Sequence, residues 1–103
     1  MRISERECEA ILAAIHAQDA RAEVYLFGSR ARDELKGGDI DLLVVSDVIT
    51  FARKMDILVA IKARMGEQRI DLKVVNRSAV ARDPFIQNIL PGAVRLALPN
   101  ELG

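Results

Sequence analysis

Residues 40–45 read Ile-Asp-Leu-Leu-Val-Val, the strongest strand pattern in the chain. Apart from its aspartate the run is aliphatic, so both faces of a strand here are apolar. This suits a central strand that is covered on both sides. Its one polar residue, Asp41, is costly to bury without a compensating partner. The stretch therefore predicts a strand inside a sheet. It also predicts that the carboxylate of Asp41 has a compensating partner.

Sequence patterns on both sides of this strand predict an alternation of helices and strands. Further strands are expected at residues 23–27, 69–75 and 93–98, and helices at about 5–19, 48–65 and 79–89. Pro84 predicts a break or a restart inside the last helix, because proline fits only the first turn. The order of elements predicts an α/β (α+β) fold with one mixed β-sheet of about four strands flanked by helices.

Two of the expected helices carry an apolar stripe. Ser4 and Glu7 have the spacing of a capping box at the start of the first helix. The stripe of that helix consists of Cys8, Ile11, Leu12 and Ile15. The stripe of the helix at 48–65 consists of Phe51, Met55, Leu58 and Val59. We expect both stripes to face the core.

The composition excludes several classes of protein. The chain has 103 residues, so we expect a single domain, 1–103, because its halves are too small for separate cores. Fifteen basic and fifteen acidic side chains cancel, which predicts no direct nucleic-acid binding. The lone cysteine excludes an internal disulfide and a multi-cysteine zinc site. A charged N-terminus and the lack of a long uncharged apolar run indicate a cytoplasmic protein without a membrane span.

Three aspartates stand where strands are expected to start. Asp39 and Asp41 are two residues apart, so on a strand their side chains project the same way, about 6.5–7 Å apart. Such carboxylates repel each other unless a cation lies between them, and oxygen ligands suit Mg2+. Asp71 on a neighbouring strand would complete a site for two ions about 3.5–4 Å apart, which serves in-line displacement at phosphorus.

Each aspartate taken alone has a simpler structural explanation. Asp39 follows a Gly-Gly pair, and aspartate is a common turn residue. Asp71 can pair with Lys73, its neighbour on the same face of the strand. The combination of three carboxylates at strand starts favours a metal site over these alternatives.

Gly28-Ser29 is typical of a phosphate-binding turn. It follows the first expected strand and precedes a short helix, whose first amides attract an anion, while glycine lets a phosphate approach the backbone. Arg30 and Arg32 would neutralise a triphosphate. The alternative is a glycine turn with a serine cap. The chain has neither the P-loop pattern nor the G-x-G-x-x-G pattern.

Together these motifs resemble the minimal nucleotidyltransferases (MNT), a group within the DNA polymerase β-like superfamily. The resemblance rests on Phe27-Gly28-Ser29-Arg30-Ala31-Arg32, Gly38-Asp39-Ile40-Asp41-Leu42-Leu43-Val44, Arg69-Ile70-Asp71-Leu72 and the closing segment 84–94. It covers nearly the whole chain. One departure is Gly38, where many members carry serine.

The resemblance implies a nucleotidyltransferase fold and a reaction. A hydroxyl attacks the α-phosphorus of a nucleoside triphosphate, ATP being the expected donor, and pyrophosphate leaves. Asp39, Asp41 and Asp71 would be the catalytic residues and would hold Mg2+, with two ions expected. Gly28, Ser29, Arg30 and Arg32 would bind the nucleotide.

The resemblance also implies a partner. Stand-alone members that resemble this chain pair with HEPN-domain proteins, often as antitoxins. The expected function is therefore transfer of AMP to a hydroxyl, notably a tyrosine, of a HEPN toxin in a hetero-oligomer. Two alternatives stay open: a non-catalytic binding module that neutralises a HEPN partner by complex formation, and nucleotidyl transfer to a small molecule. The intact set of three aspartates favours catalysis over binding alone.

Overall fold

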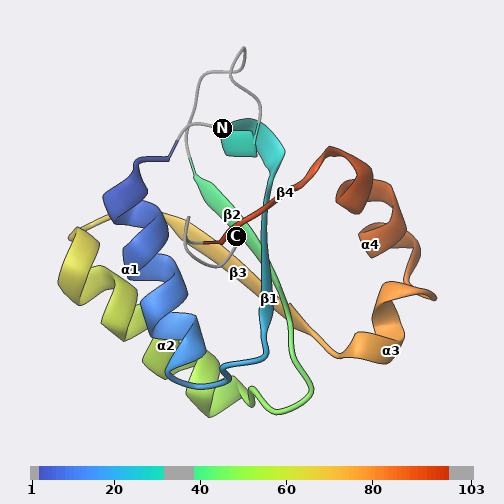
Figure 1. The fold of residues 1–103 in the computed structure, drawn as a ribbon, viewed down its shortest axis with the longest axis horizontal. Helices are drawn as coiled ribbons and strands as arrows, with labels where there is room; N and C mark the ends of the chain where they lie inside the picture. Colours follow the sequence, from blue (N-terminus) through green and yellow to red (C-terminus); the bar gives the residue numbers. More distant parts are fainter. Residues whose placement is uncertain (1–2, 32–38, 98–103) are drawn as a thin grey trace.

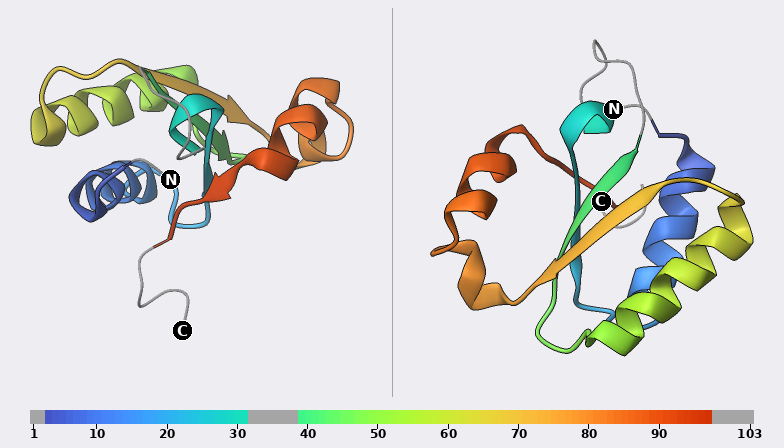
Figure 2. Two further views of the ribbon diagram at one scale, coloured as in Figure 1. Left: turned by 90° about the horizontal axis from the view of Figure 1, so that it is seen from above. Right: turned by 180° about the vertical axis from the view of Figure 1, so that it is seen from behind.

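The computed structural model describes residues 3–31 and 39–97, which form a four-stranded sheet with helices on both faces (Figures 1 and 2). In chain order the elements are α1 (Glu5–His16), β1 (Glu23–Phe27), the 3-10 helix η1 (Gly28–Ala31), β2 (Ile40–Val45), α2 (Phe51–Met65), β3 (Ile70–Val75), α3 (Arg77–Val80), α4 (Pro84–Ile89), the 3-10 helix η2 (Leu90–Gly92) and β4 (Val94–Arg95). The predicted α/β (α+β) fold with one mixed sheet is confirmed.

The strand order is β3-β2-β1-β4, so β2 lies inside the sheet as its apolar run predicts. β1 is antiparallel to both of its neighbours, whereas β2 and β3 are parallel. The parallel pairing is possible because α2 carries the chain back to the end of the sheet at which β2 begins. Both β2 and β3 therefore start beside the end of β1.

Capping residues explain where α1, α2 and α4 begin. The hydroxyl of Ser4 accepts from the amide of Glu7 at 3.1 Å, and the Glu7 carboxylate accepts from the amide of Ser4 at 2.8 Å, which is the expected capping box. α2 starts at Phe51 rather than at residue 48 because Thr50 is its N-cap. Pro84 starts α4 after the N-cap Asp83, so the predicted restart is confirmed.

Two other predicted boundaries are also wrong. α1 ends at His16 and not near Asp19, because the Asp19 carboxylate accepts from the amide of Arg21 at 2.9 Å and closes a turn there. β4 spans Val94–Arg95 rather than 93–98, since η2 continues to Gly92 and delays the strand. Residue 98 lies outside the described residues.

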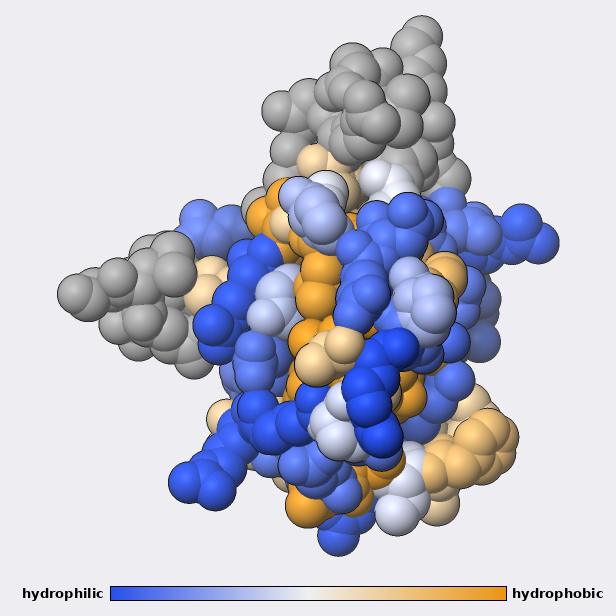
Figure 3. Space-filling view, turned by 90° about the vertical axis from the view of Figure 1, so that its right-hand side faces the viewer, coloured by the Kyte–Doolittle hydropathy of each residue, from blue (hydrophilic) through white to orange (hydrophobic). Residues whose placement is uncertain are grey.

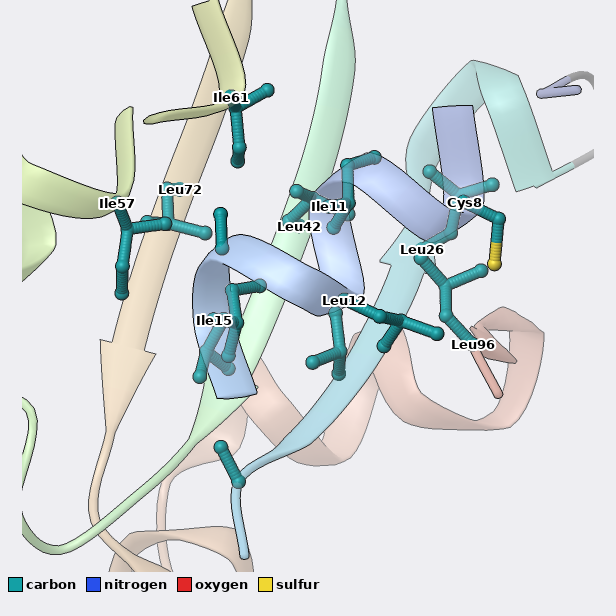
Figure 4. Close-up of a cluster of buried hydrophobic side chains, with 14 of the residues drawn as sticks. Cys8, Ile11, Leu12, Ile15, Leu26, Leu42, Ile57, Ile61, Leu72 and Leu96 are labelled. Carbon is teal, nitrogen blue, oxygen red and sulfur yellow. The ribbon is translucent and has the colours of Figure 1, made fainter. Parts of the chain in front are cut away.

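The main core lies between the sheet and the layer formed by α1 and α2 (Figure 4). Its labelled members are Cys8, Ile11, Leu12 and Ile15 of α1, Ile57 and Ile61 of α2, Leu26, Leu42 and Leu72 of the strands, and Leu96. The stripe predicted for the first helix is therefore confirmed. On the opposite side, which carries α3 and α4, hydrophilic residues surround a hydrophobic strip (Figure 3).

The stripe predicted for α2 is wrong at three of its four positions, and only Leu58, which is half-buried, packs against the core. Phe51, Met55 and Val59 are 73%, 39% and 68% exposed, whereas Ile57 and Ile61 are fully buried. α2 carries apolar residues around much of its circumference, so helical spacing alone matched more than one stripe. The sheet selects the stripe with Ile57 and Ile61, because these side chains meet Leu72 and α1 in the core.

Two substitutions in α2 distinguish these stripes. Ile57→Ala is expected to lower the free energy of unfolding by about 2–5 kcal/mol, because it leaves a cavity in the core. Val59→Ala, two residues away and exposed, should change it by less than about 0.5 kcal/mol. Chemical denaturation of both variants measures the difference. Equal losses would contradict the assignment of the buried face.

Ser46 directly follows β2 and is buried, with 4% of its surface exposed. Its hydroxyl donates to the Asp19 carboxylate at 2.6 Å and accepts from the amides of Val48 and Ile49, each at 3.2 Å. The hydrogen bond from Ser46 is the main reason that the pKa of Asp19 lies below its ordinary value of 3.8. The contact joins the end of α1 to the turn that leads into α2.

This lowered pKa predicts a pH-dependent contribution to stability. The Asp19 carboxylate favours the fold above the ordinary pKa of aspartate, and its contribution is lost as the pH falls through the lowered value. Thermal melts should therefore show Asp19→Asn below wild type at neutral pH, with the gap closing as the pH falls below about 4. Glu9→Gln, which changes an exposed acid of α1, is the control. A gap for Asp19→Asn that is independent of pH would contradict the prediction.

None of the helices within the described residues is both long and apolar enough to cross a membrane.

Candidate functional site

The ends of three strands bring the predicted site residues to one edge of the sheet. In the register of β1 and β2, Phe27 lies opposite Asp41, and in that of β2 and β3, Asp41 lies opposite Asp71. Neighbouring strands are about 4.8 Å apart, and residues in register share a face. The side chains of Phe27, Asp41 and Asp71 therefore lie side by side across the sheet, and Asp39 adjoins them just before β2. We call Asp39, Asp41 and Asp71 the aspartate row.

This row lies on the face of the sheet opposite α1 and α2. Leu42 and its alternate neighbours face the main core, so the odd-numbered Asp41 projects the other way. Asp41 is half-buried, whereas Asp39 and Asp71 are exposed. The site is thus anchored on one partly desolvated carboxylate and open to solvent at the other two.

Burial and two neighbouring carboxylates act on Asp41. Burial raises the pKa of Asp41 above its ordinary value, and the negative charges of Asp71 and Asp39 raise it further. Each of these effects penalises the ionised form of Asp41. A cation among the three would reverse the penalty.

Gly28 places the backbone directly against the Asp41 carboxylate. Its φ of +73° lies in the left-handed region that side chains disfavour. A Cβ at this position would collide with Oδ2 of Asp41. Glycine is therefore favoured by the backbone conformation, a side chain here would displace the Asp41 carboxylate, and a group bound to the backbone at the start of η1 lies next to Asp41.

Lys73 does not neutralise Asp71. Among the residues that the structure describes, no ion pair joins Lys73 to Asp71. Instead, Lys73 Nζ lies 4.7 Å from the centre of the Phe85 ring. That ring also meets Phe27 edge-on, with ring centres 6.2 Å apart and an angle of 85°. The structure thus removes the simpler explanation of Asp71 as the partner of Lys73.

Phe27 and Phe85 were not among the residues expected at the site. Phe85 comes from α4 and is 44% exposed, and its contacts with Phe27 and Lys73 place it beside the aspartate row. The motifs that carry the family resemblance include Phe27 and the segment 84–94, which contains Phe85, but they assign neither residue a role. Nothing in the local sequence ties α4 to this end of the sheet.

The carboxylates suit a hard cation in chemistry but do not form a closed cage. Within residues 3–31 and 39–97, no three acidic, histidine or cysteine side chains are arranged to hold a metal ion by themselves. Mg2+ is usually bound through one or two carboxylates, with water and substrate phosphates as its other ligands. The half-buried Asp41, its pKa raised by burial and by two neighbouring carboxylates, fits that kind of open site. The assignment of Asp39, Asp41 and Asp71 as metal ligands stays a prediction.

The remaining predicted residues lie on and after η1. The backbones of Ser29 and Arg30 are in η1, next to Gly28. Arg32 lies outside the described residues. The prediction of a phosphate-binding turn therefore rests on Gly28 and the course of the η1 backbone.

Comparison with protein families matches most of the chain to a known domain. A family model described as a nucleotidyltransferase domain matches residues 6–90, which include the aspartate row, Gly28 and Phe85. No curated protein matches the chain.

Proposed function

Because the chain belongs to the nucleotidyltransferase domain family, we propose that it is a magnesium-dependent enzyme that transfers AMP from ATP to a hydroxyl group. We further propose that the hydroxyl is a tyrosine of a HEPN toxin in the cytoplasm, so that the chain acts as an antitoxin. The observation that carries the chemistry is the register of Asp41 with Asp71, with Gly28 against the Asp41 carboxylate.

Each group of site residues has its own proposed role in the reaction. Backbone amides at Gly28 and Ser29 would hold the phosphates, and Arg30 and Arg32 would balance their charge. Asp39, Asp41 and Asp71 would hold Mg2+, which, when bound, neutralises the triphosphate and the charge that develops on pyrophosphate.

Asp71 would also accept the proton of the acceptor. The hydroxyl oxygen forms a bond to the α-phosphorus while the bond from that phosphorus to the bridging oxygen breaks. Pyrophosphate carries away the electron pair of the broken bond, and the hydroxyl proton passes to the Asp71 carboxylate and then to solvent. Positioning and charge neutralisation supply most of the rate in such transfers.

The exposure of the site supports a macromolecular acceptor. Asp71 at the start of β3 and Asp39 just before β2 are exposed, so a side chain of another protein can reach them. The proposal of a HEPN toxin rests on the resemblance of the motifs to stand-alone members with such partners.

Intact mass of the HEPN partner after co-expression tests the proposal. With wild type, the partner should gain whole AMP units. With Asp39→Asn/Asp41→Asn it should gain none, and Asp56→Asn, an exposed acid of α2, is the matched control. An unmodified partner that still co-purifies with all three versions would favour the non-catalytic binding module. Label found only on a small molecule would place the acceptor there instead.

A further inference from the structure

The outer edge of β3 carries backbone groups with no strand beside them. β3 ends the sheet order, and no strand among the described residues pairs with its outer side. The amide of Ile40 donates to the carbonyl of Arg69 at 2.9 Å, which fixes the side of the backbone that faces β2. Because alternate residues point their backbone groups to opposite sides, Ile70, Leu72 and Val74 direct theirs outward. Such an edge is a template for another strand.

The flank of α2 beside this edge is apolar and exposed. α2 is the helix that lies over β3, where Ile57 adjoins Leu72 (Figure 4). Arg53 donates to the carbonyl of Gln18, just beyond α1, at 3.4 Å and so marks the flank that faces α1. Phe51 and Met55 are each two residues from Arg53, about 200° around the helix. They therefore lie on the other flank, towards the open edge of β3.

The sequence of β3 is complementary to itself. Residues 70–74 read Ile-Asp-Leu-Lys-Val. In an antiparallel pair centred on Leu72, residues equally far from the centre lie opposite each other. Asp71 of each copy then faces Lys73 of the other, and the remaining two positions, 70 and 74, form apolar pairs. Opposite charges in such pairs stabilise a sheet, whereas like charges destabilise it.

We propose that the chain forms a two-fold symmetric homodimer in which β3 pairs with β3 of a second copy, and Phe51 and Met55 of the two α2 helices cover the junction. The charges on β3 favour a second copy over an arbitrary strand, since a lysine and an aspartate on an edge resist partners that lack matching charges. The axis is perpendicular to the sheet, so both aspartate rows open on the same face. Lys73 of one copy lies beside Asp71 of the other. This dimer goes beyond the proposed transfer reaction and does not depend on it.

Sedimentation equilibrium of the full chain over the micromolar range tests the dimer. Wild type should be dimeric, and Val74→Pro should be monomeric. The Val74 amide points outward, so proline removes no hydrogen bond within the sheet, and edge strands tolerate it there. Circular dichroism shows whether this variant folds.

Charge reversal provides a second test that does not depend on proline. Lys73→Glu places two acids opposite each other at both symmetric positions and should weaken the dimer by about tenfold or more. Asp71→Lys combined with Lys73→Glu exchanges the charges and should restore it. Oligomeric state is measured without nucleotide or acceptor, so it is independent of whether transfer occurs.

Two results would overturn the proposal. The first is a monomeric wild type throughout the range. The second is a dimer that Lys73→Glu leaves unchanged. If wild type is monomeric and Val74→Pro abolishes binding of the HEPN protein, the edge belongs to that partner instead.

Discussion

Gly28→Ala is expected to reduce nucleotidyl transfer by roughly 10²–10³-fold. The added Cβ collides with Oδ2 of Asp41, so either the carboxylate or the start of η1 has to move. The start of η1 is proposed to hold the phosphates and the Asp41 carboxylate to hold the metal ion, and small displacements of such groups cost large factors in rate. The substitution should also cost about 1–3 kcal/mol of stability, because alanine is strained at positive φ.

Gly66→Ala is a matched control for this effect. Gly66 also has a positive φ, +78°, but a Cβ there meets nothing within 4 Å. Gly66→Ala should therefore lose a similar amount of stability and retain transfer. Rates of AMP transfer and thermal melts of both variants separate the collision from the backbone strain. Equal activity of the two would show that the contact between Gly28 and Asp41 is not needed for the reaction.

Asp41→Asn is expected to abolish transfer and yet stabilise the fold. Transfer should fall by about 10³-fold or more, because the central carboxylate of the row no longer binds a cation. Without metal, however, the pKa of Asp41 is raised by burial and by Asp71 and Asp39, so ionisation of this carboxyl costs stability in the folded state. Asparagine removes that cost.

The pH dependence of this gain follows from the direction of the shift. A raised pKa means that the folded state holds its proton more tightly, so wild type loses stability as the pH rises through that range. With a chelator present, the melting temperature of Asp41→Asn should exceed that of wild type at neutral pH and approach it below about pH 4. Asp56→Asn should show neither the loss of transfer nor the gain. A destabilised Asp41→Asn at neutral pH would contradict the view that burial and the charges of Asp71 and Asp39 penalise the ionised Asp41.

The residue types of the site could be predicted from the local sequence, but their arrangement in space could not. The hydrophobic run of residues 40–45 identified Asp41 as a carboxylate within an apolar strand. Gly28 directly follows the strand expected at residues 23–27. The register of Asp41 with Asp71 depends on α2 returning the chain in parallel, over 30 residues of sequence. Phe85 is a second example, because its contact with Phe27 exists only once α4 folds back over the sheet.

The exposed flank of α2 shows the limit of periodicity most clearly. Apolar residues at helical spacing predicted a helix at 48–65, yet Phe51 and Val59 face solvent while Ile57 and Ile61 face the sheet. Helical spacing of apolar residues shows only that the helix has an apolar face. The geometry of the sheet and of α1 determines which of several apolar faces becomes buried.

The sequence by itself determined the strands around residues 23–27 and 40–45, the capped start of α1, the restart at Pro84 and the kind of chemistry that three aspartates and a glycine turn permit. These features depend on side-chain size, backbone freedom and charge within a few residues. Only the tertiary structure decided the order of the strands, the buried face of α2 and the opposition of Gly28, Asp41 and Asp71. Those depend on contacts between segments far apart in the chain, whose free energies are set by the packing of the whole sheet with its helices.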